Sequence, residues 1–275
     1  MAIKLFISDV HLGAGRYSEE SNNTEKYPYD WDWLSLDETE NFMNFIRFLH
    51  TGYDRKIEEV VLLGDIFDNW VFPYDLVPPT MEELLETEKN KSVIKELNTL
   101  ANKTKVYYVP GNHDMHATAA VMKEYFPDVV YCPNRYSSDR LIAEHGHRYA
   151  MFNAPARFST NIMGLPLGYF ISRTEATKKA MTNSEGRSYH TYVDDFIEMF
   201  GEQTLPQSVL EAVIEEAGLD EEIEYKIKRK NGQVQSKSAI EVKEVYKNIY
   251  SDWPTSTVSR HRAVFAGRSQ RQAVG

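Results

Sequence analysis

Aspartate, asparagine and histidine recur in four short segments of this sequence, and each segment follows a run of apolar residues. The segments are Asp9-x-His11, Gly64-Asp65-x-x-Asp68, Gly111-Asn112-His113-Asp114 and His145-Gly146-His147. Imidazole nitrogens together with carboxylate and amide oxygens suit Mn, Fe or Zn better than Ca, which prefers oxygen ligands alone. The residue types therefore indicate a site for divalent transition metals.

Two divalent ions held side by side can hydrolyse a phosphate ester. A carboxylate on a short loop can bridge two ions about 3.5–4 Å apart, and Asp65 is the natural candidate for that role. Such ions would bind phosphate oxygens, lower the pKa of a bridging water and hold that water in line for attack. The leaving oxygen needs a proton, which a histidine beside the site can donate. The expected chemistry is metal-dependent hydrolysis.

None of the four segments is specific on its own. Asp9-x-His11 is a common chance pair, Gly64-Asp65 is more often a turn than a ligand, and a single His145 is usually an ordinary polar residue. The four segments in this order, each at the end of an apolar run, are much harder to explain by chance. The set as a whole therefore predicts a functional site.

Short apolar runs that end near these segments predict the strands that must position them. The expected strands are Ile3–Ser8, Val60–Leu63, Lys105–Val109, Val129–Tyr131 and Arg140–Glu144. Helical spacing of apolar residues predicts helices in between, at Asp37–His50, Met81–Ala101 and Ala117–Phe126. Strands that alternate with helices indicate an α/β layered domain. Because ligands of open α/β sheets bind outside the carboxyl ends of the strands, we expect the four segments to meet there.

The pattern changes between about residues 155 and 253, where helical patterns dominate. The expected helices are Thr174–Met181, Tyr189–Phe200, Pro206–Ala217 and Ala239–Tyr250. Ile223–Lys228 alternates in hydrophobicity and is followed by Asn231-Gly232, which predicts a β-hairpin. We interpret this stretch as a helical insertion or cap within a single domain that spans residues 1–275.

Composition places the chain among ordinary globular proteins. It has 275 residues, of which 42% are hydrophobic and 26% charged, and a formal net charge of -10. The acidic balance argues against a broad nucleic-acid surface, although bound metals can reverse the local charge for a phosphate substrate.

The one cysteine, Cys132, excludes a disulfide within the chain and a cysteine-rich zinc site. The N-terminal apolar run is too short for a signal peptide and no stretch approaches a membrane span, so we expect a cytoplasmic protein.

Over Met1 to about Phe152, the four segments resemble the motifs of the calcineurin-like metallophosphoesterases. The resemblance implies an α/β sandwich of two β-sheets flanked by helices, here with a helical insertion. It also implies a dinuclear site with two divalent metal ions, most commonly manganese, with iron and zinc as alternatives. The substrate would be a small phosphorylated or nucleotide-like molecule, cleaved as a phosphate monoester, diester or pyrophosphate, with nucleic acid less favoured. The start Asp9-Val10-His11-Leu12 and the insertion after His145 are similar to those of UDP-diacylglucosamine diphosphatases.

The resemblance assigns metal ligands to single positions. Asp9 and His11 would bind one metal, Asp65 would bridge, and Asn112 and His145 would bind the second metal.

It assigns the catalytic roles to the third segment. His113 would lie beside the substrate phosphate as the acid or as a transition-state stabiliser, and Asp114 would orient it. Asp68 matches the motif, but we expect it to lie behind the ligands rather than among them.

The last motif of the family, Gly-His-x-His, is replaced here by Gly267-Arg268-Ser269-Gln270, after the predicted strand Val258–Ala266. Arginine offers only hydrogen-bond donors and cannot ligate a metal as a cation, whereas Gln270 offers a weaker amide oxygen. Arg268 could instead bind the substrate phosphate with its planar fork of donors. Two interpretations stay open: a metal-dependent phosphoesterase, or a degenerate phosphoesterase-fold binding module with a weakened metal site.

Overall fold

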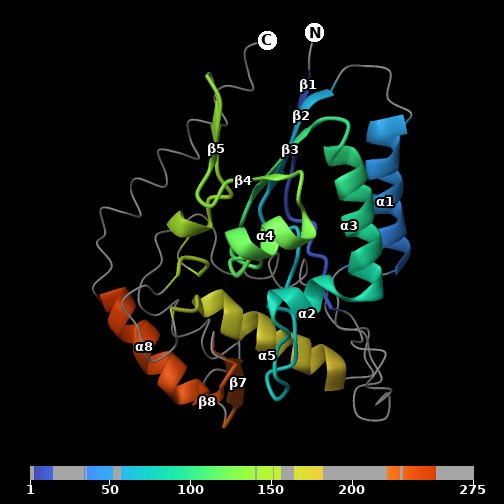
Figure 1. Cartoon of the computed structure of the whole chain (residues 1–275). Helices are drawn as coiled ribbons and strands as arrows, with labels where there is room; N and C mark the ends of the chain where they lie inside the picture. The colour runs from blue at the N-terminus through green and yellow to red at the C-terminus, as the bar shows by residue number, and fades with distance from the viewer. Residues whose placement is uncertain are drawn as a thin grey trace, which may run out of the picture.

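Four parallel strands form the centre of the protein (Figure 1). The computed structural model describes residues 3–14, 34, 36–51, 57–139, 141–150, 152–155, 164–181, 222–229 and 232–251. The strands, hydrogen-bonded in the order β1-β2-β3-β4, are β1 (Ile3–Ile7), β2 (Ile57–Leu63), β3 (Lys105–Val109) and β4 (Val130–Tyr131). Val60, Val61 and Leu62 are fully buried, which is typical of a parallel sheet covered on both faces. The carboxyl ends of all four strands lie along one edge of the sheet.

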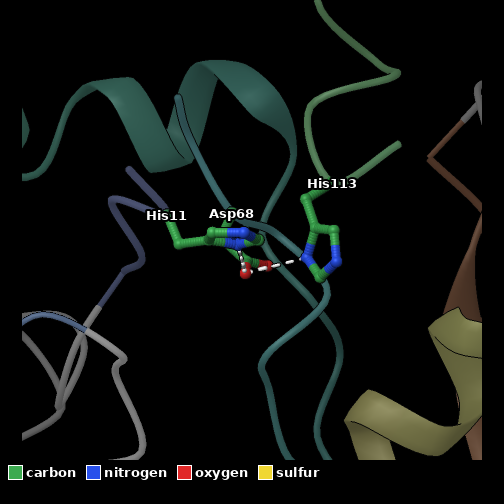
Figure 2. Close-up of side chains that lie close together, drawn as sticks. All are labelled: His11, Asp68 and His113. Atoms are coloured by element: carbon green, nitrogen blue, oxygen red, sulfur yellow. Dashed lines mark hydrogen bonds and ion pairs between the residues drawn. The ribbon is translucent and has the colours of Figure 1, made fainter. Parts of the chain in front are cut away.

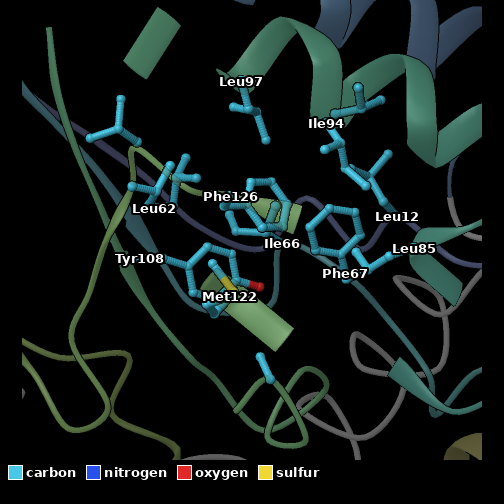
Figure 3. Packing of buried hydrophobic residues seen from close by; sticks show 14 of the residues in the cluster. Leu12, Leu62, Ile66, Phe67, Leu85, Ile94, Leu97, Tyr108, Met122 and Phe126 are labelled. Carbon is cyan, nitrogen blue, oxygen red and sulfur yellow. The ribbon is translucent and has the colours of Figure 1, made fainter. Parts of the chain in front are cut away.

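Helices cover one face of this sheet and build the larger hydrophobic core (Figure 3). The helices on this face are α1 (Leu36–Thr51), α3 (Glu88–Ala101) and α4 (Ala119–Tyr125). Leu62 and Tyr108 of the sheet share this core with Leu97 of α3 and with Phe126, which follows α4. Each large apolar side chain buried here contributes about 1.5–3 kcal/mol, so this layer holds the sheet rigid behind its loops.

One predicted helix is two helices in the structure. The sequence pattern predicts a single helix over Met81–Ala101, whereas α2 covers Met81–Leu85 and α3 begins at Glu88. Thr87 has an extended backbone, and its side chain accepts a hydrogen bond from Asn90 N at the start of α3. A threonine N-cap requires this non-helical backbone, so Thr87 separates the two helices.

A short antiparallel hairpin covers the opposite face of the central sheet. It consists of β5 (Tyr136–Ser137) and β6 (Ile142–Ala143). Tyr136 is buried and shares a separate hydrophobic cluster with Val61 and Val109 of the central sheet. This second sheet packed on the first confirms the predicted two-sheet arrangement flanked by helices.

The later part of the chain packs beyond the carboxyl ends of the central strands (Figure 1). Its elements are α5 (Leu167–Met181), β7 (Glu224–Lys228), β8 (Val234–Ser238) and α8 (Ala239–Ser251), and we call them the cap. The predicted hairpin is confirmed, since β7 pairs with β8 and Gly232 in the turn has a φ of 82°. α5 begins at Leu167 rather than at the predicted Thr174, because Leu167 and Phe170 are buried and extend its packed face.

Several predicted elements lie outside the described residues, namely Tyr189–Phe200, Pro206–Ala217 and Val258–Ala266. The assignment of residues 155–253 to an insertion within one domain therefore stays a prediction. No helix in the described ranges combines the length and apolar character that crossing a membrane requires.

Candidate metal centre

The loops after β1 and β2 run side by side and continue the pairing of their strands. Asp9 N donates to the carbonyl oxygen of Gly64 at 3.1 Å, and His11 N donates to that of Asp65 at 2.9 Å. An isolated parallel bridge between Leu12 and Phe67 extends the pairing further. The two loops therefore bring Asp9, His11 and Asp65 to one place at the edge of the sheet.

Three predicted ligands share an unusual backbone conformation. The φ angle is 57° at Asp9, 55° at His11 and 53° at Asp65, all in the left-handed region. A residue other than glycine is uncommon in this region, and holding it there costs about 1–3 kcal/mol. The inter-loop hydrogen bonds offset this cost, and such strain clusters at functional sites. The backbone thus indicates a functional site independently of the residue types.

Asp65 lies at the centre of the site and is almost completely buried. Its Oδ1 accepts a hydrogen bond from His113 N at 2.8 Å, which fixes the plane of the carboxylate. Its Oδ2 lies 3.1 Å from Nε2 of His145 and 4.0 Å from Nε2 of His11. One carboxylate oxygen therefore faces two imidazole nitrogens, as a bridging ligand would.

The orientation of His145 is set by the end of β2. Nδ1 of His145 donates to the carbonyl oxygen of Leu63 at 3.0 Å, so Nε2 is the nitrogen that faces the site. Nε2 lies 3.1 Å from Oδ1 of Asn112 as well as beside Asp65. Burial opposes a charge on the ring, but the hydrogen bond to Asp65, the charges of Asp65 and Asp9 and the Leu63 carbonyl together outweigh it and raise the pKa of His145 to about 9. A proton on Nε2 thus occupies the position that suits a metal cation.

The donor set of this group fits a divalent transition metal. The ligand atoms of Asp9, Asp65 and His145 all lie within 4.8 Å of one another. Oδ1 of Asn112 is turned toward the same point, and this side chain is buried. Metal-binding histidines typically donate their second ring nitrogen to a carbonyl or carboxylate, as His145 does to Leu63.

Asp68 joins His11 to His113 through a single oxygen atom (Figure 2). Its Oδ2 lies 2.7 Å from Nδ1 of His11 and 2.8 Å from Nδ1 of His113. Because a carboxylate oxygen accepts, both Nδ1 atoms donate and both Nε2 atoms are left for other partners. Burial favours the neutral carboxyl, yet the two rings outweigh it and hold the pKa of Asp68 far below its usual range. Asp68 therefore lies behind the ring of His11, on the side away from Nε2.

Asp114 has a different position from the one expected. We expected it to orient His113, but the contact to that ring comes from Asp68. The carboxylate of Asp114 accepts from Gly111 N at 2.6 Å, from Ile66 N at 2.9 Å and from the hydroxyl of Tyr108 at 2.6 Å. It therefore ties the loop after β3 to the loop after β2. Burial and the nearby Asp65 charge raise the pKa of Asp114 to about 6.

Trp70 contacts the site although the sequence analysis did not single it out. Its indole stacks on the ring of His113, with centroids 4.2 Å apart and an interplanar angle of 29°. Its position two residues after Asp68, directly before the apolar residues Val71 and Phe72, was the available signal. Arg268, the predicted phosphate ligand, lies outside the described residues.

The chain matches a known protein family over most of its length. The model of the calcineurin-like phosphoesterase family matches residues 5–203, which include Asp9, Asp65, Asn112 and His145. No curated protein sequence matches the chain. Among solved structures, the chain is similar to the Pseudomonas putida nuclease MPE, with 16% identity and a TM-score of 0.30. That match covers 50% of this chain and 50% of the nuclease, so the chain spans half the length of that relative.

Proposed function

Because the chain belongs to the calcineurin-like phosphoesterase family, we propose that it hydrolyses a small phosphate ester or pyrophosphate in a site held by two divalent metal ions. The substrate is a monoester, a diester or a pyrophosphate of a small, nucleotide-like molecule. A nucleic acid is less favoured, since the net charge of -10 opposes an extended polyanion. Manganese as the metal and a cytoplasmic location stay predictions from the sequence.

The position of Asp65 is the observation that carries this proposal. Its Oδ2 faces Nε2 of His145 at 3.1 Å and Nε2 of His11 at 4.0 Å. A carboxylate oxygen that faces two imidazole nitrogens supports the proposal that Asp65 would bridge two metal ions. Asp9 and His11 would hold the first ion, and Asn112 and His145 would hold the second.

Bound divalent ions supply Lewis acidity toward phosphoryl oxygens and lower the pKa of a coordinated water. The chain itself supplies rigidity, because His113 N fixes Oδ1 of Asp65 and Leu63 O fixes Nδ1 of His145. The positions of these two ligands are therefore set before substrate arrives, which reduces the reorganisation that catalysis requires.

His113 is the candidate proton donor to the leaving oxygen. Its Nδ1 donates to the Asp68 carboxylate, so Nε2 is the nitrogen that can face the leaving oxygen. The neighbouring ring of His11 meets it edge-on at 4.5 Å, with an interplanar angle of 83°. A proton held at Nε2 of His113 would pass to the departing oxygen.

The test is hydrolysis of p-nitrophenyl phosphate, bis-p-nitrophenyl phosphate and inorganic pyrophosphate by chelator-treated protein, with and without added manganese. We expect turnover of at least one substrate that depends on the metal. Asp65→Asn should abolish it, whereas Asp128→Asn, a change at an exposed carboxylate just before the amino end of β4, should not. No release from any substrate with manganese, iron or zinc would refute the enzymatic proposal.

The replacement of Gly-His-x-His by Gly267-Arg268-Ser269-Gln270 favours a second candidate, a binding module that retains the fold and part of the metal site. Loss of residues that only support a metal ligand typically weakens metal binding by about 10–100-fold, so loss of two ligands should weaken it at least as much. The double variant Arg268→His with Gln270→His separates the two candidates. A large gain in rate and metal content indicates a disabled enzyme, whereas phosphate-ligand binding with no gain in rate indicates a binding module.

A further inference from the structure

Trp70 lies between the cap and the imidazole of His113. The indole is fully buried and belongs to the hydrophobic cluster of the cap. One face stacks on His113 at a centroid distance of 4.2 Å, and the ring of Tyr169 on α5 meets the indole edge-on at 5.9 Å. A methyl group at Gly168 would lie 3.4 Å from Cζ3 of Trp70, so α5 packs closely against the indole. A single side chain therefore joins the cap to the candidate acid.

The indole is held by packing rather than by a hydrogen bond of its own. Nε1 of Trp70 has no hydrogen-bond partner among the described residues. A buried tryptophan N–H usually finds one, so the stack and the cap contacts determine how the ring lies. Any change in cap packing that moves the indole should therefore move the surface against which His113 rests.

Asp68 fixes the backbone of Trp70 and the ring of His113 together. Its Oδ1 accepts from Trp70 N at 2.8 Å and from Val71 N at 3.0 Å, while its Oδ2 accepts from His113 Nδ1 at 2.8 Å. The edge of the imidazole is thus held by Asp68 and its face by Trp70. The hydrogen bond alone leaves the ring free to tilt about the Nδ1 contact, and the stack removes that freedom.

The cap is attached firmly to the loop that carries Trp70. Arg173 on α5 is fully buried, and its guanidinium donates to the carbonyl oxygens of Pro73 at 2.7 Å, Leu76 at 2.7 Å and Lys226 at 3.1 Å. It also donates to the hydroxyl of Tyr169 at 2.6 Å. Guanidinium donors that satisfy several buried carbonyl groups fix their relative positions. The loop after Trp70, α5 and β7 therefore form one packed body.

We propose that Trp70 is a positioning residue through which the packing of the cap sets the orientation of His113. This inference rests on the proposed function, in which His113 gives the proton to the leaving oxygen. The cap then contributes to the chemical step through the Tyr169–Trp70–His113 contacts, without touching the reacting atoms. Small displacements of a catalytic group cost rate rather than substrate binding.

The kinetic test compares Trp70→Leu, Trp70→Phe, Tyr169→Leu and the double variant Trp70→Leu with Tyr169→Leu, with the nitrophenyl substrate that the wild type turns over. We expect Trp70→Leu to lower kcat about tenfold or more, with KM and metal content nearly unchanged. Trp70→Phe, which keeps a flat aromatic face, should recover most of the rate. The double variant should be no slower than Trp70→Leu, because both changes act on one contact. Fold-changes that multiply, or an unchanged kcat in Trp70→Leu, would overturn the proposal.

A matched control separates positioning from loss of stability. Leu97→Ala removes a fully buried side chain of α3 from the other hydrophobic core, so it should lower the unfolding midpoint and leave kcat unchanged. If Trp70→Leu does not fold, kcat of Tyr169→Leu and of Trp70→Phe decides the same question. Tyr169→Leu should lower kcat, whereas Trp70→Phe should keep most of it. A fall in kcat in Leu97→Ala as large as in Tyr169→Leu would assign the effect to stability alone.

A second readout does not need catalysis. In protein labelled with carbon-13 at histidine Cε1, the His113 resonance is assigned by its loss in His113→Asn, and we expect the ring current of the stacked indole to shift it upfield. Tyr169→Leu keeps the indole but should change this shift, whereas Leu97→Ala should not. If the wild type hydrolyses no ester, the proposed function fails while this measurement still decides the positioning. An identical His113 shift in wild type and Tyr169→Leu would refute it.

Discussion

The imidazole of His145 packs directly on the backbone of Gly64. A methyl group at position 64 would lie 2.6 Å from Cγ and from Nδ1 of His145, and Gly64 has a φ of 86°. The glycine of the second motif therefore makes room for the histidine of the fourth. Two segments far apart in the sequence depend on each other at this contact.

Gly64→Ala should therefore displace His145 and weaken metal binding. We expect metal affinity to fall by at least about tenfold, because one ligand loses its orientation, and activity to fall with it. Elemental analysis after dialysis and kcat with saturating manganese are the measurements. Gly232→Ala is the matched control, since Gly232 has a similar φ of 82° but nothing within 4 Å of the added methyl group. Equal metal content in Gly64→Ala and Gly232→Ala would contradict the prediction.

Gly111 leaves space for the carboxylate of Asp65, as Gly64 does for His145. A methyl group there would lie 2.1 Å from Oδ1 of Asp65 and 2.7 Å from its backbone nitrogen. Because the backbone cannot yield as easily as a flexible side chain, Gly111→Ala should lower the free energy of unfolding by about 1–3 kcal/mol and reduce metal content. Urea denaturation of metal-free protein measures the first effect separately from the second. If Gly111→Ala has the same stability and the same metal content as the wild type, the prediction is wrong.

The two carboxylates Asp68 and Asp114 should differ in their effects. Asp68→Asn replaces one of the two acceptor oxygens with an NH2 donor, so the side chain cannot accept both from the two histidines and from the backbone of Trp70 and Val71. We expect kcat to fall by about 100-fold with a smaller loss of stability. Asp114→Asn disturbs the bonds from Gly111 and Ile66, so it should lower stability by about 1–3 kcal/mol and affect kcat less. Steady-state kinetics and urea denaturation of both variants test this contrast. A larger loss of kcat in Asp114→Asn would restore the role first expected for it.

His145 should make the metal-free protein sensitive to pH. Burial lowers its pKa, but the hydrogen bond and charge of Asp65, with smaller contributions from the Leu63 carbonyl and Asp9, raise the pKa from 6.5 to about 9. The stabilisation from this group is therefore fully present below pH 6.5 and is lost as the pH rises through about 9. The unfolding free energies of chelator-treated wild type and His145→Asn should accordingly converge as the pH is raised across this range.

Metal binding should show the opposite trend in the same range. A metal requires the neutral imidazole, so its binding releases the proton of His145 and its affinity increases with pH. Titration with manganese at pH 6.5 and 9 measures the difference for the wild type. A metal affinity that does not change with pH would place His145 outside the ligand set.

Much of the central fold could be predicted from the sequence because its elements are specified locally. The apolar run Lys105–Val109 is β3 itself, and the turn at Asn231-Gly232 predicted the β7–β8 hairpin. Helix boundaries were less predictable, because Thr87 could be read either as a helical residue or as the N-cap that it is. Periodicity continues across such a cap, so it does not reveal the break.

The sequence by itself determined which residues could bind metal and that they follow strand ends, because residue type and strand direction are local properties. Only the tertiary structure decided their partners. Asp68, rather than Asp114, holds His113, and Trp70 rather than a polar neighbour supports its face. These contacts depend on how the loops after β2 and β3 and the helix α5 pack against one another. No spacing along the chain encodes that arrangement, since it follows from the shape of the buried side chains that fill the space between these elements.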